Sequence, residues 1–217
     1  MLIYYIFLCI FSYLLGSINF ARIAAFFWRK PIKEGENPGA TVAFRQISKS
    51  AGVFTAFFDI LKGAFPIFLF QYYFYAHPTS NIFRFSYLKL PFFTFLVGAL
   101  AIIGHCWPIY YKFKGGRGGA TTIGVALSTL FKILPLWNWI ILLLIYLFLV
   151  FVLRMNLGLI GLILLPLILF FIFLSQGLIN FYQYFLGIAL IILILMLRNS
   201  DQIRNFWKIN HQLKTNH

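Results

Sequence analysis

Apolar runs of membrane-spanning length recur along nearly the whole chain. A transmembrane helix needs about 17–25 mostly apolar residues, because the hydrocarbon core of a bilayer is about 30 Å thick. Hydrophobic residues occupy 62% of the 217 positions, with only four carboxylates among them, and a soluble domain of this size cannot bury so much apolar surface. We therefore predict an all-α, polytopic integral membrane protein with a single membrane domain, 1–217. Seven spans fit best, although five or six remain compatible: 2–27, 52–76, 90–111, 119–134, 137–153, 157–174 and 178–197.

Basic residues are divided unevenly between the predicted loops. With the N-terminus outside and seven spans, 13 of the 18 Lys and Arg residues fall in cytoplasmic segments. Membrane proteins keep Lys and Arg on that side, which accounts for the formal charge of +14 without a nucleic-acid partner. We predict Met1 outside and the C-terminus in the cytoplasm. The first run has no basic segment before it and no A-x-A site after it, so a retained helix is expected rather than a signal peptide.

The sequence carries no signature of metal or redox chemistry. Cys9 and Cys106 lie in separate apolar runs, and neither belongs to a CxxC pair. The four histidines also lack the spacing of metal ligands. We therefore expect no metal site, no disulfide and no cofactor.

A glycine-rich basic loop lies between the third and fourth predicted spans. The segment 104–124 reads GHCWPIYYKFKGGRGGATTIG, with four glycines around the basic side chains and a Thr pair opening the next apolar run. Glycines let consecutive backbone N–H groups form an anion-binding concavity, and a helix N-terminus adds the positive end of its dipole. The nucleotide P-loop pattern GxxxxGK[ST] is absent. We interpret the segment as a phosphate site, with an ordinary turn between helices as the alternative.

Two further polar clusters are predicted on the same side of the membrane. The turn sequence NPGAT at 37–41 is followed by Arg45, whose planar guanidinium suits a phosphate. Asp59 and Lys62 lie inside the second predicted span, where each charge costs roughly 2.5–3.5 kcal/mol on insertion scales and normally pairs or lines a polar cavity. Because they are i, i+3 neighbours, Asp59 is expected to orient Lys62 towards the basic loops. A self-neutralising structural pair is the alternative.

Together these segments resemble the bacterial acyl-phosphate:glycerol-3-phosphate acyltransferase (PlsY) family. Segment 104–124 is similar to the family pattern GHxxPxxxxFKGGKGxATxxG, NPGAT with Arg45 to GSGNPGATN-x-x-R, and the string from Asp59 to D-x-x-K-G-x-x-P. Residues 154–158 resemble R-x-S-L-x-S, and the tail resembles HRxNIxRL, with a basic anchor on anionic lipid as an equal alternative for the tail. The resemblance implies transfer of a long-chain acyl group from acyl phosphate to glycerol 3-phosphate, giving lysophosphatidic acid and phosphate in phospholipid synthesis. It also implies the bacterial inner membrane, contact with membrane lipid, and other enzymes of phospholipid synthesis as candidate partners.

The same resemblance implies roles for individual residues. Its catalytic candidates are His105, Arg45 and Lys62. His105 would either accept the hydroxyl proton or donate to the carbonyl oxygen, and no Ser-His-acid or HxxxxD arrangement offers a covalent route. The implied substrate-binding residues are Asn37, Gly39, Thr41, Asp59, Gly63, Lys114, Gly115, Gly116, Arg117, Gly118, Thr121, Asn156, Asn199 and Gln202.

Several positions depart from the family pattern. The Ser of GSGN is missing, Arg117 replaces Lys, and Asn199 and Gln202 stand where the family has His and Asn. A diverged paralogue with weak or lost acyltransferase activity is therefore one alternative. A small transporter or scramblase for anionic metabolites is a less favoured one, since an intramembrane Asp59–Lys62 pair and a basic mouth would suit it. The polar groups gather on one side of the predicted membrane, which favours the enzyme.

Overall fold

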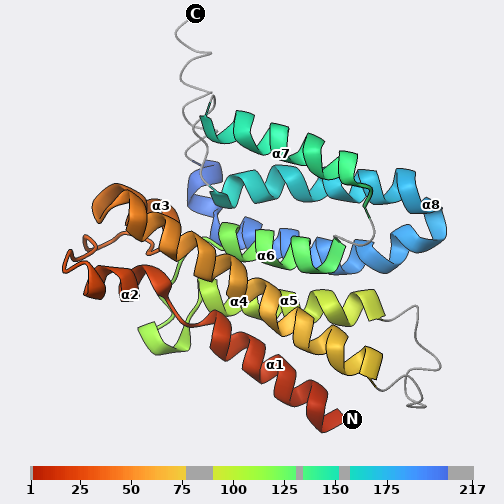
Figure 1. Cartoon of the computed structure of the whole chain (residues 1–217), viewed down its shortest axis with the longest axis horizontal. Helices are drawn as coiled ribbons and strands as arrows, with labels where there is room; N and C mark the ends of the chain where they lie inside the picture. The colour runs from red at the N-terminus through yellow and green to blue at the C-terminus, as the bar shows by residue number, and fades with distance from the viewer. Residues whose placement is uncertain (1, 77–89, 131–133, 152–156, 205–217) are drawn as a thin grey trace, which may run out of the picture.

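The computed structural model describes residues 2–76, 90–130, 134–151 and 157–204, and every regular element in these ranges is a helix (Figure 1). The predicted all-α class is therefore confirmed. Asn156, one of the predicted site residues, lies outside the described residues. The elements are α1 (Leu2–Gly16), α2 (Phe20–Phe27), α3 (Ala40–Gln46), α4 (Lys49–Ala76), α5 (Leu90–Cys106), the short 3-10 helix η1 (Ile109–Tyr111), α6 (Gly119–Leu130), α7 (Leu136–Phe151) and α8 (Leu157–Arg198).

The first apolar run, expected as one helix over 2–27, is broken in the structure into α1 and α2, which are bent by 41° relative to each other. Asn19 caps α2, because its side-chain oxygen accepts from the Arg22 backbone N–H at 3.1 Å. A cap residue has non-helical dihedral angles, here φ −98° and ψ 95°, so the chain must leave α1 before Asn19. The Asn19 amide also donates to the Pro38 carbonyl at 3.4 Å, which ties the bend to the turn that precedes α3.

Helix α6 lies inside the bundle, with nine of its 12 residues buried, and it packs against α4, α5 and α8. Two glycines allow its close contact with α4. A side chain at Gly63 would overlap the Thr121 carbonyl, and one at Gly124 would overlap the Ile60 carbonyl. Small residues let the backbones of membrane helices approach closely. Gly63 therefore packs two helices together, and the substrate-binding role implied for it stays a prediction.

Helix α8 doubles back in Figure 1, so that both of its ends lie on the same side of the molecule as α3. Its two arms contain the apolar stretches Ile163–Leu174 and Tyr184–Arg198. Buried side chains of α4, α5 and α6, such as Ile67, Phe95 and Val125, pack with those of α8 into the main hydrophobic core. The core thus fixes the relative positions of α4, α5, α6 and α8, which contribute polar residues to the site described below.

Helix length bears on the predicted spans. By length and composition, two helices of the described part, Lys49–Tyr73 and Phe93–Tyr111, are able to cross a membrane, and the bent α1–α2 pair makes a third if it is one span. Helix α6 is about 18 Å long at 1.5 Å per residue, shorter than a hydrocarbon core of about 30 Å. Helix α7 and the two arms of α8 are apolar but also short. The count of seven spans stays a prediction.

Candidate active site

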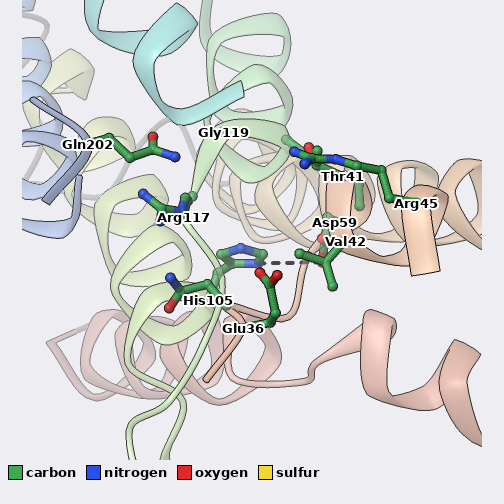
Figure 2. Close-up of a pocket in the computed structure, with 14 residues that line it drawn as sticks. Glu36, Thr41, Val42, Arg45, Asp59, His105, Arg117, Gly119 and Gln202 are labelled. Atoms are coloured by element: carbon green, nitrogen blue, oxygen red, sulfur yellow. Dashed lines mark ion pairs between the residues drawn. The ribbon is translucent and has the colours of Figure 1, made fainter. Parts of the chain in front are cut away.

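A pocket of about 270 Å³ lies where the turn before α3, helix α3 itself, the end of α5 and the start of α6 meet. Figure 2 shows that its lining side chains come from distant parts of the sequence, with His105 and Asp59 between Arg117 on one side and Arg45 on the other. Gln202, just beyond α8, contributes from the C-terminal part of the chain. The three polar clusters predicted from the sequence thus contribute to one site.

Three buried ionisable side chains lie beside the pocket. Asp59 Oδ1 is 2.9 Å from Lys62 Nζ and 3.5 Å from His105 Nδ1, and none of the three side chains is more than 5% exposed (Figure 2 marks the Asp59–His105 pair). Lys62 also donates to the Ile18 carbonyl at 2.7 Å, at the bend between α1 and α2. Asp59 and His105 line the pocket, whereas Lys62 does not. The predicted Asp59–Lys62 pair is therefore present, and direct contact of Lys62 with a substrate stays a prediction.

Some buried polar atoms of the pocket have unused hydrogen-bonding capacity. Among the described residues, Asp59 Oδ1, His105 Nδ1 and Gln202 Oε1 are buried without a well-aligned hydrogen-bond partner. Nearly all buried polar atoms in proteins have such a partner, so exceptions at a pocket wall indicate a place for a polar ligand. The two ion pairs of Asp59 compensate its charge without satisfying this requirement.

The glycine loop is folded against His105. After α5 ends at Cys106, the chain passes through η1 and turns at Lys112 and Phe113, whose φ values are 51° and 60°. The Gly116 backbone N–H then donates to the His105 carbonyl at 3.0 Å. A side chain at Gly116 would overlap Nε2 of the imidazole. Glycine is therefore required here for the loop to lie directly against the ring.

Helix α6 begins at the pocket wall. Gly118 has a φ of 86°, a conformation that favours glycine, and it turns the loop into α6. Gly118, Gly119 and Ala120 all line the pocket. The first N–H groups of a helix have no partner within the helix, and its N-terminus carries a partial positive charge. Helix α6 begins at Gly119, the first residue of the predicted span 119–134, and its start at the pocket wall suits an anion.

Two arginines line the pocket from different elements, Arg45 from α3 and Arg117 from the glycine loop. Arg117 also forms a bidentate ion pair with Asp201, with Nη1–Oδ1 at 3.2 Å and Nη2–Oδ2 at 2.9 Å. Partial burial raises the pKa of Asp201, but the hydrogen bonds and charge of Arg117 outweigh it, so the pKa of this carboxyl lies below its ordinary value. Asp201 therefore neutralises part of the charge that Arg117 offers to an anion.

Arg198, the last residue of α8, joins two walls of the pocket. Its Nε donates to the Gly116 carbonyl at 2.8 Å, and its Nη2 donates to the Gly115 carbonyl at 2.6 Å. The same Nη2 donates to Asn37 Oδ1 at 2.7 Å. The guanidinium thus holds the glycine loop and the turn before α3 together.

The structure brings most of the predicted site residues to the pocket or to its supports. Those that line it are Asn37, Gly39, Thr41, Arg45, Asp59, His105, Arg117, Gly118 and Gln202. Those that do not line it are Lys62, Gly63, Lys114, Gly115, Gly116, Thr121 and Asn199. The Lys114 side chain is exposed, and Asn199 is buried and donates to the Arg117 carbonyl at 3.4 Å.

Sequence reasoning missed two charged residues of this region, Arg198 and Asp201. Glu36 directly precedes the NPGAT turn, so the sequence places its negative charge next to the predicted anion site, and in the structure it lines the pocket. Arg198 directly precedes the predicted Asn199, and Asp201 directly precedes the predicted Gln202. Nothing in the local sequence indicates which loop Arg198 or Asp201 contacts.

Comparison with known proteins places the chain in a family. The sequence profile of the Glycerol-3-phosphate acyltransferase family matches residues 6–209. A glycerol-3-phosphate acyltransferase of Blochmanniella floridana is 32% identical over 210 residues, which cover 94% of this chain and 92% of that protein. Those of Mycoplasmoides gallisepticum and Staphylococcus haemolyticus are 36% and 40% identical, with 60% and 55% of this chain aligned. The aligned segments span 54% and 57% of those two relatives, about half of their length.

Two solved structures have a similar fold. Both are crystal structures of PlsY, described as an integral membrane glycerol 3-phosphate acyltransferase, in a lysophosphatidic acid form and a glycerol 3-phosphate form. Each has a TM-score of 0.66 and covers 94% of this chain and 92% of its own, with sequence identities of 26% and 25%. With the helical fold and the matching profile, the chain is an integral membrane protein that belongs to the glycerol-3-phosphate acyltransferase family.

Proposed function

We propose that this protein transfers a long-chain acyl group from acyl phosphate to glycerol 3-phosphate, giving lysophosphatidic acid and phosphate for phospholipid synthesis. The observation that carries the proposal is the composition of the pocket. Arg45, Arg117 and the start of α6 supply positive charge beside the buried Asp59–His105 pair. Family membership and the two forms of PlsY, one with glycerol 3-phosphate and one with lysophosphatidic acid, support this class of substrate.

The chemistry requires positioning and charge neutralisation more than a covalent intermediate. An acyl phosphate is already activated, because phosphate is a good leaving group. A hydroxyl oxygen of glycerol 3-phosphate bonds to the acyl carbon, and the bond from that carbon to the phosphate oxygen breaks, with its electron pair leaving on the phosphate. The arginines and the N–H groups of α6 would bind the phosphates and stabilise the charge that develops on the leaving group.

His105 is the candidate to accept the proton that the attacking hydroxyl loses. It lines the pocket, and its Nδ1 lies 3.5 Å from Asp59 Oδ1. A neighbouring carboxylate orients an imidazole and stabilises the imidazolium that forms when the ring takes up a proton. Lys62, at 2.9 Å from the same oxygen, would keep Asp59 in place and ionised. This arrangement favours proton acceptance by His105 over donation to the carbonyl oxygen.

The proposal extends to location and partners. The polar pocket lies at the side of the bundle where α3 and both ends of α8 are found, and the basic loops are concentrated in the same segments. We infer that this side faces the cytoplasm of a bacterial inner membrane, with Met1 outside. Acyl phosphate, glycerol 3-phosphate and membrane lipid are the expected partners, together with other enzymes of phospholipid synthesis.

A second candidate is a diverged family member with weak or lost activity. Glu36 lines the pocket, and Asp201 pairs with Arg117. Two carboxylates at the site of anionic substrates oppose their binding through like-charge repulsion. The two candidates differ in the rate of catalysis, so one assay separates them.

The test uses purified protein in detergent with palmitoyl phosphate and labelled glycerol 3-phosphate. Phosphate release that depends on glycerol 3-phosphate, with the label recovered in lysophosphatidic acid, is the expected result. A His105→Gln variant should lose this activity while keeping the wild-type elution profile in gel filtration. Absence of labelled product from well-folded wild-type protein would contradict the proposal and favour the diverged family member.

A further inference from the structure

Arg198 occupies an unusual position for a cation next to an anion pocket. It does not line the pocket, and among the described residues it makes three hydrogen bonds, 2.6–2.8 Å long, all to oxygen atoms of the protein. Its guanidinium also lies over the Trp107 ring, 5.9 Å from the centroid. A planar guanidinium held by several hydrogen bonds has a fixed orientation. Arg198 is therefore part of the framework and does not act as a mobile surface charge.

The contacts of Arg198 determine how the glycine loop is oriented. The described chain has no cis peptide bond, so the C=O and N–H of each peptide unit point in opposite directions. Since the Gly115 and Gly116 carbonyls both point to the guanidinium, the N–H groups of Gly116 and Arg117 point away from it. The first of these donates to the His105 carbonyl at 3.0 Å. The guanidinium thus links the conformation of the loop to the position of His105.

The third hydrogen bond of Arg198 connects the glycine loop to a separate wall of the pocket, the turn before α3. Asn37, which accepts from Nη2 at 2.7 Å, opens the NPGAT turn, and it lines the pocket itself. Asn19 also contacts this turn, because its amide donates to the Pro38 carbonyl at 3.4 Å. The turn before α3 is therefore tied both to the α1–α2 bend and to Arg198.

We propose that Arg198 is a positioning residue for the transfer reaction: it sets the distance between the glycine loop and the turn before α3. This inference rests on the acyl transfer proposed above. The guanidinium acts through its geometry. Its donors lie in one fixed plane and reach the Gly115 carbonyl, the Gly116 carbonyl and the Asn37 side-chain oxygen at the same time. A lysine ammonium keeps the charge but lacks that array, so Arg198→Lys separates geometry from charge.

The experiment measures kcat/KM for glycerol 3-phosphate in wild-type protein, Arg198→Lys and Arg198→Gln, at low salt and near 1 M salt. Arg204→Lys is the matched control, since Arg204 lies further along the same C-terminal segment and, in the part of the chain that the structure describes, donates to the Ser200 carbonyl at 3.3 Å. We expect Arg198→Lys to lose about tenfold to a hundredfold, as small misplacements of binding groups do. The loss should persist in high salt, where the Debye length is about 3 Å. Arg204→Lys should stay within about twofold of wild type.

Several outcomes would overturn the proposal. Arg198→Lys with nearly wild-type kcat/KM would show that a cation suffices, and a loss that disappears in high salt would assign Arg198 to long-range attraction of the substrate. If Arg198 variants do not fold, Asn37→Ala tests the same contact from its other end, because it removes the acceptor for Nη2. Its kcat/KM should fall by a similar factor at low salt and near 1 M salt. Wild-type kcat/KM in well-folded Asn37→Ala would contradict the link between Arg198 and the turn before α3.

Calorimetric binding of glycerol 3-phosphate to the same samples separates the two proposals. If wild-type protein binds glycerol 3-phosphate but transfers no acyl group, the proposed function fails. In that case weaker binding by Arg198→Lys, with unchanged binding by Arg204→Lys, would still support a positioning role in the pocket. Equal binding by wild type and Arg198→Lys, or no binding by either, would exclude the role.

Discussion

Replacing Gly116 with alanine would place a methyl group where the imidazole of His105 lies, because an ideal Cβ at this position overlaps Nε2. The backbone of Gly116 has little freedom to retreat. Its N–H donates to the His105 carbonyl at 3.0 Å, and its carbonyl accepts from Arg198 at 2.8 Å. The imidazole must therefore move, and it is only 5% exposed and 3.5 Å from Asp59. We expect Gly116→Ala to separate His105 from Asp59.

The size of the effect follows from that separation. An interaction with a charged group contributes about 1.5–3 kcal/mol, and this is the interaction with Asp59 that the protonated imidazole would lose. If the cost falls on the transition state, kcat/KM drops roughly tenfold to a hundredfold, since each 1.4 kcal/mol corresponds to a factor of ten. The affinity for acyl phosphate alone should change less, because the arginines and the start of α6 keep their places.

The assay is phosphate release that depends on glycerol 3-phosphate, measured for four proteins: wild type, Gly116→Ala, His105→Ala and the double variant. Removing the imidazole makes room for the new methyl group, so the double variant should be no slower than His105→Ala alone. Wild-type kcat/KM in a well-folded Gly116→Ala variant would show that the new methyl group does not displace His105. So would losses that simply multiply in the double variant, because Gly116 would then act independently of His105.

Further predictions concern charge, donor and topology. Asp201→Asn should strengthen inhibition by inorganic phosphate, because it frees Arg117 for anions; unchanged inhibition would count against a phosphate contact there. Arg117→Ala should lower kcat/KM roughly tenfold to a hundredfold through the loss of a charge-assisted contact, with partial recovery in Arg117→Lys, whereas Lys112→Ala should stay near wild type. Acyl-CoA should not replace palmitoyl phosphate as donor, and equal rates would contradict this. In a cysteine-free background, a single cysteine within 77–89 should react from outside and one within 28–50 only after permeabilisation; the reverse pattern would invalidate the proposed orientation.

The parts of the site that the sequence predicted are those with a local signal. Glycines next to basic residues indicate a backbone turned towards an anion, and an Asn-Pro-Gly turn indicates a fixed reversal of the chain. An Asp59–Lys62 pair in an apolar run indicates an ion pair, which the structure contains at 2.9 Å. The resemblance to a family then brought these segments together, which composition and periodicity alone do not do.

The remaining features depend on contacts between distant segments. Arg198 contacts Asn37, 161 positions away, and nothing in a basic residue at a helix end indicates that partner. Asp201 likewise pairs with Arg117 only because α8 ends beside the glycine loop. Lys114 shows the converse: it matches the family pattern, yet its side chain is exposed and outside the pocket. The break at Asn19 was hidden by an apolar run that continues on both sides.

A structure of the protein with bound glycerol 3-phosphate would show directly whether this pocket is the active site. We expect the phosphate against the N-terminus of α6, within hydrogen-bond distance of Arg117 or Arg45, and a hydroxyl directed to the side of the pocket lined by His105 and Asp59. Binding elsewhere in the molecule, or a hydroxyl directed away from His105, would contradict the assignment of this pocket as the active site.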